Sequence, residues 1–111
     1  MRENKIYISH ILDCIDHILS YTKELNEDSF NQNFMVQDAV VRNFEIIGEA
    51  TKRLSVEFRN IHSNIPWKNM AGMRDRLIHN YFQVDLETVW DAITTVLPSL
   101  LIDLKKIHSQ L

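Results

Sequence analysis

The stretch ISHILDCIDHILSYTKEL, residues 8–25, decides the fold of this chain. Its apolar residues recur at steps of three and four, as they do on one face of an α-helix, while Asp13, Asp16, Lys23 and Glu24 fall on the opposite face. Such a helix has to bury its apolar stripe against other elements of the same domain. The stripe consists of Ile8, Ile11, Leu12, Ile15, Ile18, Leu19 and Leu25.

The same period predicts a second helix that begins at Phe34 or Met35, after a polar loop over residues 26–33. Gly48 lies within this helix, where a glycine is unfavourable by about 1 kcal/mol relative to alanine. We therefore expect Gly48 to permit the close approach of another helix. The apolar face should comprise Val36, Val40, Phe44, Ile47, Thr51 and Leu54.

Capping and helix-breaking residues predict the remaining helices. Ser55 should cap a short helical turn, and Pro66 suits the first turn of a helix that runs to about Tyr81. Asp85 is a good N-cap for the final helix, which Pro98 should kink or divide. The stripe of that helix consists of Leu86, Val89, Trp90, Ile93, Val96, Leu97, Leu100, Leu101, Leu104 and Ile107.

Composition predicts a single all-α domain over residues 1–111. Hydrophobic residues make up 45% of the chain, and only two Gly and two Pro interrupt it. We expect an antiparallel bundle of four long helices plus a short helix. The apolar runs are too short to cross a bilayer, and the charged N-terminus is unlike a secretion signal, so we expect a cytoplasmic protein with no membrane contact.

The cysteine and histidine residues do not predict a metal site. Cys14 is the single cysteine, so it cannot form an intrachain disulfide, and its place in the first helix favours a packing role. His10 and His17 are seven residues apart, and no nearby carboxylate completes a set of metal ligands.

Positive charge is concentrated in the middle of the chain. The net charge is −3, which argues against a general nucleic-acid coat protein. Residues 52–79 nevertheless carry a local charge of +4, from Lys52, Arg53, Arg59, Lys68, Arg74 and Arg76 against Glu57 and Asp75. This basic island is either a solvated helix surface or a confined cleft that binds phosphate.

The motif RDRLIHNY, residues 74–81, lies at the end of the basic island. Arg74 can clamp a phosphate, His79 can take or give a proton near neutral pH, and Tyr81 offers a hydroxyl for modification. Taken singly, the three have ordinary alternatives: an ion-paired surface arginine, a histidine at a helix end, and a half-buried aromatic.

The spacing of Arg74, His79 and Tyr81 resembles the signature of the HEPN superfamily, specifically the HepT-type toxins. Residues 42–50 resemble the second helix of that family, residues 65–67 its lead-in to the motif helix, and residues 84–90 its last helix. The resemblance covers nearly the whole chain. It implies a HEPN-like helical dimer with a ribonuclease cleft at the dimer interface.

Helical geometry also favours a homodimer, or a higher assembly. At about 100° per residue, Arg74 and His79 lie roughly 140° apart on one helix, so two motif helices that face each other would complete the cleft. Some apolar side chains also exceed what one subunit should cover. These candidates are Trp67, Met70, Met73, Leu77, Phe82 and Trp90.

The expected reaction is cleavage of single-stranded RNA without a metal or a cofactor. His79 would act as general base or acid, and Arg74 would hold the scissile phosphate. Asp75 and Asn80 would orient these groups, and Arg76 would add a backbone contact. Because the ribose 2′-OH is the nucleophile, DNA should be inert.

The resemblance implies a second role for Tyr81. HepT-type proteins are paired with a small nucleotidyltransferase antitoxin of the MntA type, which transfers AMP to the motif tyrosine, so Tyr81 would be the acceptor in a type VII-like toxin–antitoxin pair. The alternative is a non-catalytic helical dimer that binds such a nucleotidyltransferase or serves as its accessory subunit. A third possibility, a structural bundle without enzymatic activity, leaves the basic island unexplained.

Overall fold

The computed structural model describes residues 2–73, 75 and 85–111, and all regular structure in this part of the chain is helical. The predicted all-α class is therefore confirmed. The elements are α1 (Arg2–Thr22), α2 (Glu27–Gln32), α3 (Phe34–Arg53), α4 (Val56–Ile61), α5 (Trp67–Ala71), α7 (Leu86–Asp91), the π-helical segment η1 (Ala92–Val96) and α8 (Leu97–Ser109). Of the four long helices expected, α1, α3 and the continuous run α7–η1–α8 are described. Of the fourth, the motif helix predicted from Pro66 to about Tyr81, the first part is described as α5, and residues 74 and 76–81 lie outside the described residues.

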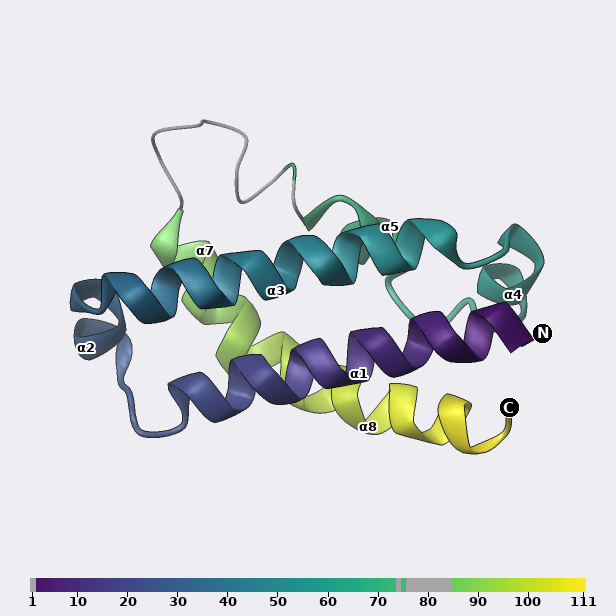
Figure 1. Ribbon diagram of the computed structural model, residues 1–111, viewed down its shortest axis with the longest axis horizontal. Coiled ribbons are helices and arrows are strands. Elements are labelled where there is room, and N and C mark those ends of the chain that lie inside the picture. Colours follow the sequence, from purple (N-terminus) through teal and green to yellow (C-terminus); the bar gives the residue numbers. More distant parts are fainter. Residues whose placement is uncertain (1, 74, 76–84) are drawn as a thin grey trace.

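Helices α1, α3 and α8 form the body of the molecule (Figure 1). α1 and α3 lie side by side in opposite directions, and α8 runs back along α1, so the two ends of the chain lie at the same end of the fold. α5 packs against α3, while α2 contacts both α3 and α7 at the opposite end. The segment that contains the motif lies between α5 and α7 in the sequence, outside these three long elements.

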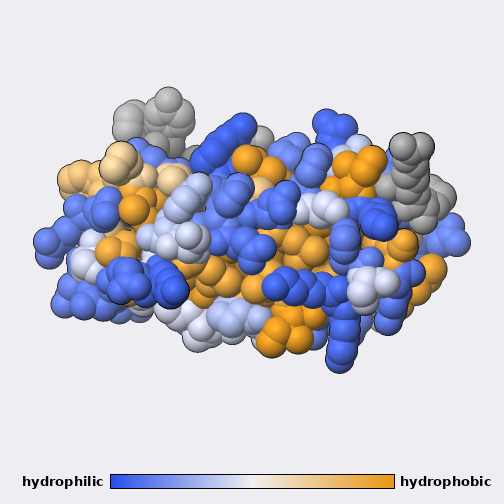
Figure 2. Space-filling view, turned by 60° about the horizontal axis from the view of Figure 1, so that its bottom comes forward, coloured by the Kyte–Doolittle hydropathy of each residue, from blue (hydrophilic) through white to orange (hydrophobic). Residues whose placement is uncertain are grey.

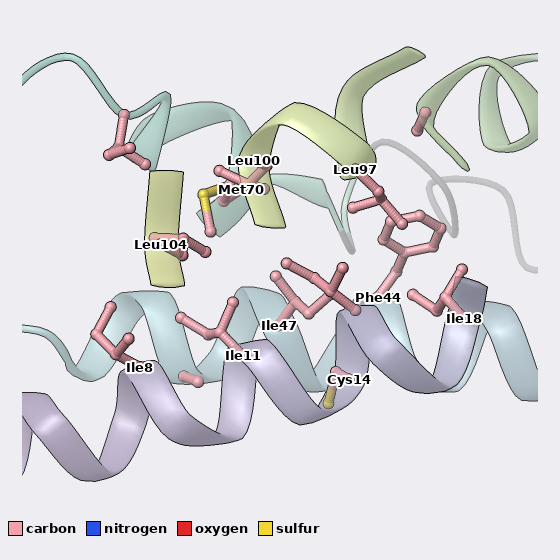
Figure 3. Packing of buried hydrophobic residues seen from close by; sticks show 14 of the residues in the cluster. Ile8, Ile11, Cys14, Ile18, Phe44, Ile47, Met70, Leu97, Leu100 and Leu104 are labelled. Carbon is pink, nitrogen blue, oxygen red and sulfur yellow. The ribbon is translucent and has the colours of Figure 1, made fainter. Parts of the chain in front are cut away.

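The core is built largely from aliphatic side chains at the helical spacing seen in the sequence. Ile8, Ile11, Ile15 and Ile18 of α1 are fully buried, as predicted. Figure 3 shows side chains from α1, α3, α5 and α8 converging on the space between these helices. Burial of the apolar stripes is the main stabilising contribution to folding, and its free energy grows with the apolar area removed from water.

Cys14 belongs to this core. Its side chain is buried among the aliphatic residues (Figure 3). Burial raises the pKa of the Cys14 thiol above its ordinary value, and the negative charge of Asp13 adds to the effect, although Arg42 opposes it. The side chain therefore stays a neutral thiol at physiological pH, and the predicted packing role is confirmed.

The prediction of a loop over residues 26–33 is wrong, because helix α2 occupies Glu27–Gln32. Asn26 and Ser29 form a reciprocal capping box: the Ser29 N–H donates to Asn26 Oδ1 at 2.9 Å, and the Asn26 N–H donates to Ser29 Oγ at 2.9 Å. Phe30 anchors the short helix, with no exposed surface, against the ring of Trp90. The capping residues and Phe30 were the signal, which the polar composition obscured.

The final helix is not divided at Pro98, because α7, η1 and α8 follow one another without a break; only the winding changes just before the proline. Pro98 lies in the first turn of α8, immediately after η1, and it has no N–H to donate back into the preceding turn. There the Leu97 N–H donates to the Ala92 carbonyl five residues back, which defines a π turn. The wider turn changes the helical register, so Val96 is 38% exposed instead of buried as its place in the stripe predicted.

The other predicted caps and the start of α3 are confirmed. α3 begins at Phe34, and the Ser55 side chain accepts the Phe58 N–H at the start of α4. Asn4 of α1 is buried and ties this cap to the first helix: its amide donates to Ser55 Oγ at 3.2 Å and accepts the Ser55 N–H at 3.1 Å. α4 is thereby fixed beside the N-terminal end of α1.

The apolar residues exposed at the surface differ from those expected. Trp67 and Met70 are only 6% and 3% exposed, because α4 covers Trp67 while α3 and α8 cover Met70. Met73 and Trp90 are half-buried against the core. Leu77 lies outside the described residues, as does Phe82. In the view of Figure 2, apolar side chains are scattered in patches among hydrophilic ones. The large exposed ones include Phe34, Met35, Val56, Ile61 and Ile102. No helix within the described ranges is both long and apolar enough to span a membrane.

Candidate functional site

The described residues include the segments before and after the motif, which end at Met73 and begin again at Asp85. Asp75 is exposed on helical backbone. The other predicted site residues, namely Arg74, Arg76, His79, Asn80 and Tyr81, lie outside the described residues.

The helix that leads into the motif is interrupted early. It begins at Trp67, as predicted, but α5 ends at Ala71, and Gly72 follows as its C-cap before helical backbone resumes at Met73. A glycine is a poor helix former, which explains why the expected unbroken helix from Pro66 does not form. The part of that prediction that reaches Tyr81 lies outside the described residues.

Trp67 fixes α5 to the end of α4. Its indole Nε1 donates to the His62 carbonyl at 2.9 Å and to the Arg59 carbonyl at 3.2 Å. These bonds satisfy backbone acceptors at the C-terminal end of α4, which have no partner within that helix. The Phe58 ring lies 6.0 Å from the Trp67 ring and 4.7 Å from that of His62. The lead-in to the motif is thus held by both polar and aromatic contacts.

Gly48 allows the backbone of α5 to approach α3 closely. A Cβ atom at position 48 would lie 3.3 Å from both the Met70 and the Ala71 carbonyl oxygens. Such contacts are tighter than ordinary packing, so the expectation that Gly48 permits close approach is confirmed. The position of α5, three residues before Arg74, depends on the absence of a side chain here.

The two ends of the motif segment face each other across one small cleft. Met70 and Met73, upstream of the motif, and Thr88 and Ala92, downstream of it, line the same cavity of about 140 Å³, which α3 closes from the other side with Phe44. The fold therefore brings the two ends of the motif segment together, although Met73 and Thr88 are fifteen positions apart in the sequence.

A larger hollow of about 660 Å³ lies between α4 and α5. Arg59 and Lys68 contribute positive charge, and Asn60, Ser63 and Asn69 contribute neutral hydrogen-bonding groups. No described carboxylate lines it. Its remaining lining is Val56, Ile65, Pro66, Trp67 and Ala71. We call it the α4–α5 hollow.

Arg59, which lines this hollow, has a buried donor. Its Nε atom is shielded from solvent and meets no hydrogen-bond acceptor among the described residues. An unsatisfied buried donor is unfavourable by about 1–3 kcal/mol, and by more when it carries charge, so each such group calls for an explanation.

A second hollow, of about 490 Å³, lies on the downstream side and has the opposite charge. Glu27, Glu87 and Asp91 line it together with Thr88, Trp90 and Thr94. Beside it, Asp85 caps α7 by accepting the Thr88 hydroxyl at 2.7 Å and the Thr88 N–H at 3.1 Å. These hydrogen bonds lower the pKa of the Asp85 carboxyl below its ordinary 3.8, and the bond from the Thr88 hydroxyl contributes most.

Sequence reasoning located the basic island but not the division of its charges. Lys52 pairs with Glu49 at 3.8 Å on α3, whereas Arg59 and Lys68 come together in the α4–α5 hollow. The placement of Asn60, Ser63 and Asn69 in the lining of this hollow was not foreseen, because isolated polar residues give no periodic signal. Within residues 2–73, 75 and 85–111, no three His, Cys, Asp or Glu side chains gather as a metal site.

The chain matches the family described as Ribonuclease HepT-like over residues 11–107. That range contains the whole motif and nearly the entire helical domain. The chain therefore belongs to the HepT-like ribonuclease family, and the resemblance seen in the sequence is confirmed.

Individual relatives agree with this membership. A Methanocaldococcus jannaschii protein named "Gamma-glutamylcyclotransferase and putative RNase" is 46% identical over 110 residues, which are 99% of this chain but 50% of that protein. A "putative RNase" of Caldanaerobacter subterraneus subsp. tengcongensis is 40% identical over 96% of both chains. A Thermococcus cleftensis protein named "Probable ribonuclease HepT" is 41% identical over 89% of this chain and 90% of its own. No solved structure matches the chain.

Proposed function

We propose that this protein is a metal-independent endoribonuclease, the toxin of a type VII-like toxin–antitoxin pair. The observation that carries the proposal is the family match over residues 11–107, inside which Arg74, His79 and Tyr81 keep the expected spacing. The names of the relatives, which refer to ribonucleases, support the same class of reaction.

The proposed step is an attack by the ribose 2′-OH on the adjacent phosphorus. One His79 removes the proton from the 2′-OH, and the His79 of a second copy protonates the 5′-oxygen as it leaves. Arg74 stabilises the negative charge that develops on the phosphate. The bond to the 5′-oxygen breaks as the bond to the 2′-oxygen forms, which leaves a 2′,3′-cyclic phosphate and a 5′-hydroxyl.

A homodimer is part of this proposal, because the step uses acid and base groups from two copies. The close packing of α5 on Gly48 and the anchoring of Trp67 hold the helix that leads into the motif against the body of the subunit. The proposed step requires that the catalytic groups of the two copies be held in register.

Regulation is proposed to act through Tyr81. A nucleotidyltransferase of the MntA type would transfer AMP from ATP to the Tyr81 hydroxyl, with release of pyrophosphate. Each AMP adds negative charge and bulk two residues from His79, which opposes the binding of RNA. The partner antitoxin and the RNA substrate are the two ligands that this function requires.

The test is an RNA-cleavage assay with EDTA present. Wild type should cleave single-stranded RNA, and His79→Ala or Arg74→Ala should reduce the rate by about 10²–10⁴. His10→Ala is the matched control, because His10 is an exposed histidine on α1. Full activity in a folded His79→Ala protein would overturn the mechanism, as would activity that EDTA removes and a divalent ion restores.

The same proteins test the regulatory part. Tyr81→Phe should still cleave RNA, yet it should gain no mass in AMP steps on incubation with the nucleotidyltransferase and ATP, whereas wild type should. Equal mass gains in both would exclude Tyr81 as the acceptor. A wild-type dimer that binds the nucleotidyltransferase but cleaves no RNA would favour the non-catalytic accessory role.

A further inference from the structure

We propose that the α4–α5 hollow is a second phosphate-binding site, which holds the backbone of the RNA strand beside the catalytic motif. RNA as the ligand rests on the proposed function, whereas the preference for phosphate rests on the residues that line the hollow. These residues lie outside the motif and were not among the predicted site residues.

The charges of the hollow favour an anion. The ion pairs found among the described residues join Arg42 to Glu45 and Lys52 to Glu49, so no described carboxylate neutralises Arg59 or Lys68. Glu57 is exposed on α4 but does not line the hollow. Two cations that line one hollow, with no carboxylate in that lining, attract a phosphate group.

The hydrogen-bonding groups of the hollow also match a phosphate. Arg59 brings guanidinium donors to the lining, and its Nε is a buried donor without a described acceptor. Asn60, Ser63 and Asn69 offer further donors at its edge. Because a phosphate group presents acceptor oxygens in several directions, this mixture of cationic and neutral donors suits it better than it suits a cation or an apolar ligand.

The place of the hollow in the fold favours a polynucleotide over a free ion. Lys68 and Ala71 line it from α5, and Arg74 follows only three residues after Ala71. Its volume of about 660 Å³ exceeds what a single phosphate needs, and it is open at the surface. A strand whose scissile phosphate is held by Arg74 can therefore place a neighbouring phosphate against Arg59 and Lys68.

The experiment measures binding of a fluorescent single-stranded RNA that carries 2′-O-methyl groups and so cannot be cleaved. Affinity is followed by anisotropy over a series of salt concentrations. Lys68→Gln and Arg59→Gln should each weaken binding by about tenfold at low salt. Each should also reduce the slope of log K against log salt by about 0.7, the value expected for one lost contact to a single strand.

The matched control is Lys23→Gln, which removes the same charge at the other end of α1. Lys23 is exposed just after α1, whereas α4 is tied to the start of that helix through Asn4. A helix of 21 residues separates the two sites by about 30 Å. Because Lys68 is exposed, its replacement should leave the melting temperature unchanged, so the Lys68 result stands even if Arg59→Gln unfolds the protein.

The outcomes separate this proposal from the proposed function. If Lys68→Gln binds RNA as tightly as Lys23→Gln does, with the same salt slope, the hollow is not a phosphate site for RNA. If Lys68→Gln weakens binding of inorganic phosphate or AMP but not of RNA, the RNA assignment is wrong. If wild type binds the RNA through the hollow but cleaves no unmodified RNA, the second site stands and the ribonuclease function fails.

Discussion

The two ends from which the motif segment runs differ in how they are held and in their charge. On the upstream side, α5 is buried through Trp67 and Met70, lies against Gly48 and borders a basic hollow. On the downstream side, α7 begins at an exposed cap, Asp85, and borders an acidic hollow. α7 is nevertheless anchored beyond its cap, because Val89 is fully buried and the Trp90 ring meets Phe30. The clearest difference between the two sides is therefore their charge.

This difference means that a protein with a net charge of −3 still has one locally basic surface, which the proposed RNA binding requires. In the proposed complex with RNA, a phosphate contact on the basic, upstream side fixes the strand relative to the motif. The acidic side would repel the RNA backbone and so limit the direction in which a strand can lie. The three predictions that follow act on the two sides separately.

The largest effect is expected from Gly48→Val. The added side chain meets the Met70 and Ala71 carbonyls, so α5 has to move, and we expect a loss of about 1–3 kcal/mol in the free energy of unfolding. RNA cleavage per folded molecule should also fall, because α5 leads into the motif. Urea unfolding and the cleavage assay measure the two effects.

Asp38→Val serves as its control, because Asp38 is exposed on the same helix. It introduces the same β-branched side chain without a neighbour to displace, so its stability should change by less than about 0.5 kcal/mol. Equal losses in the two variants would show that helix propensity, and not the approach of α5, decides the effect.

A smaller effect is expected from Trp67→Phe. The ring remains, but the donor to the Arg59 and His62 carbonyls is lost, which should reduce the free energy of unfolding by about 1–2 kcal/mol. Trp90→Phe is the matched control, because the indole of Trp90 donates to no acceptor found among the described residues. A loss in Trp90→Phe as large as that in Trp67→Phe would assign the effect to ring volume.

The smallest effect is expected at Asp85, and it should depend on pH. The hydrogen bonds from Thr88 favour the ionised carboxylate, which lowers the pKa of Asp85. The stabilisation is therefore present above its ordinary value of 3.8 and is lost as the pH falls through the lower pKa of the folded state. Asp85→Ala should melt slightly below wild type near pH 7.

Between pH 7 and a pH below 3.8, the gap between the two melting temperatures should narrow, because protonation weakens the wild-type cap. Asp85→Asn provides the control, since its amide oxygen still accepts the Thr88 N–H without an ionisable group. An equal gap between Asp85→Ala and wild type at both pH values would show that ionisation of Asp85 does not contribute.

Local signals predicted the body of the fold and the caps. The period of Ile8, Ile11, Ile15 and Ile18 predicted their burial, because a helix with one apolar stripe has only one face to bury. Ser55 and Asp85 were predictable as caps, because their hydrogen bonds reach only three residues along the chain. The same kind of signal exists for α2, in the capping residues Asn26 and Ser29, but the polar composition of residues 26–33 obscures it.

Contacts between distant parts of the sequence were not predictable in this way. Trp67 and Met70 were expected to exceed what one subunit covers, yet α3, α4 and α8 bury them. Val96 is exposed because a π turn shifts the register of the helix, and the apolar pattern of the sequence does not predict that turn. Each of these outcomes depends on where another helix lies.

The sequence by itself determined the helical class, the apolar stripes, most helix ends, the family and the motif that carries the proposed chemistry. These follow from residue type and short spacing, which act within a few residues of the chain. Only the tertiary structure decided that Gly48 admits α5, that Met73 and Thr88 line one cleft, and that Arg59 and Lys68 converge in one hollow. The physical reason is that such sites form where helices distant in sequence pack together. The distance between the two backbones then determines which side chains meet, and the residue pattern of either segment does not contain that distance.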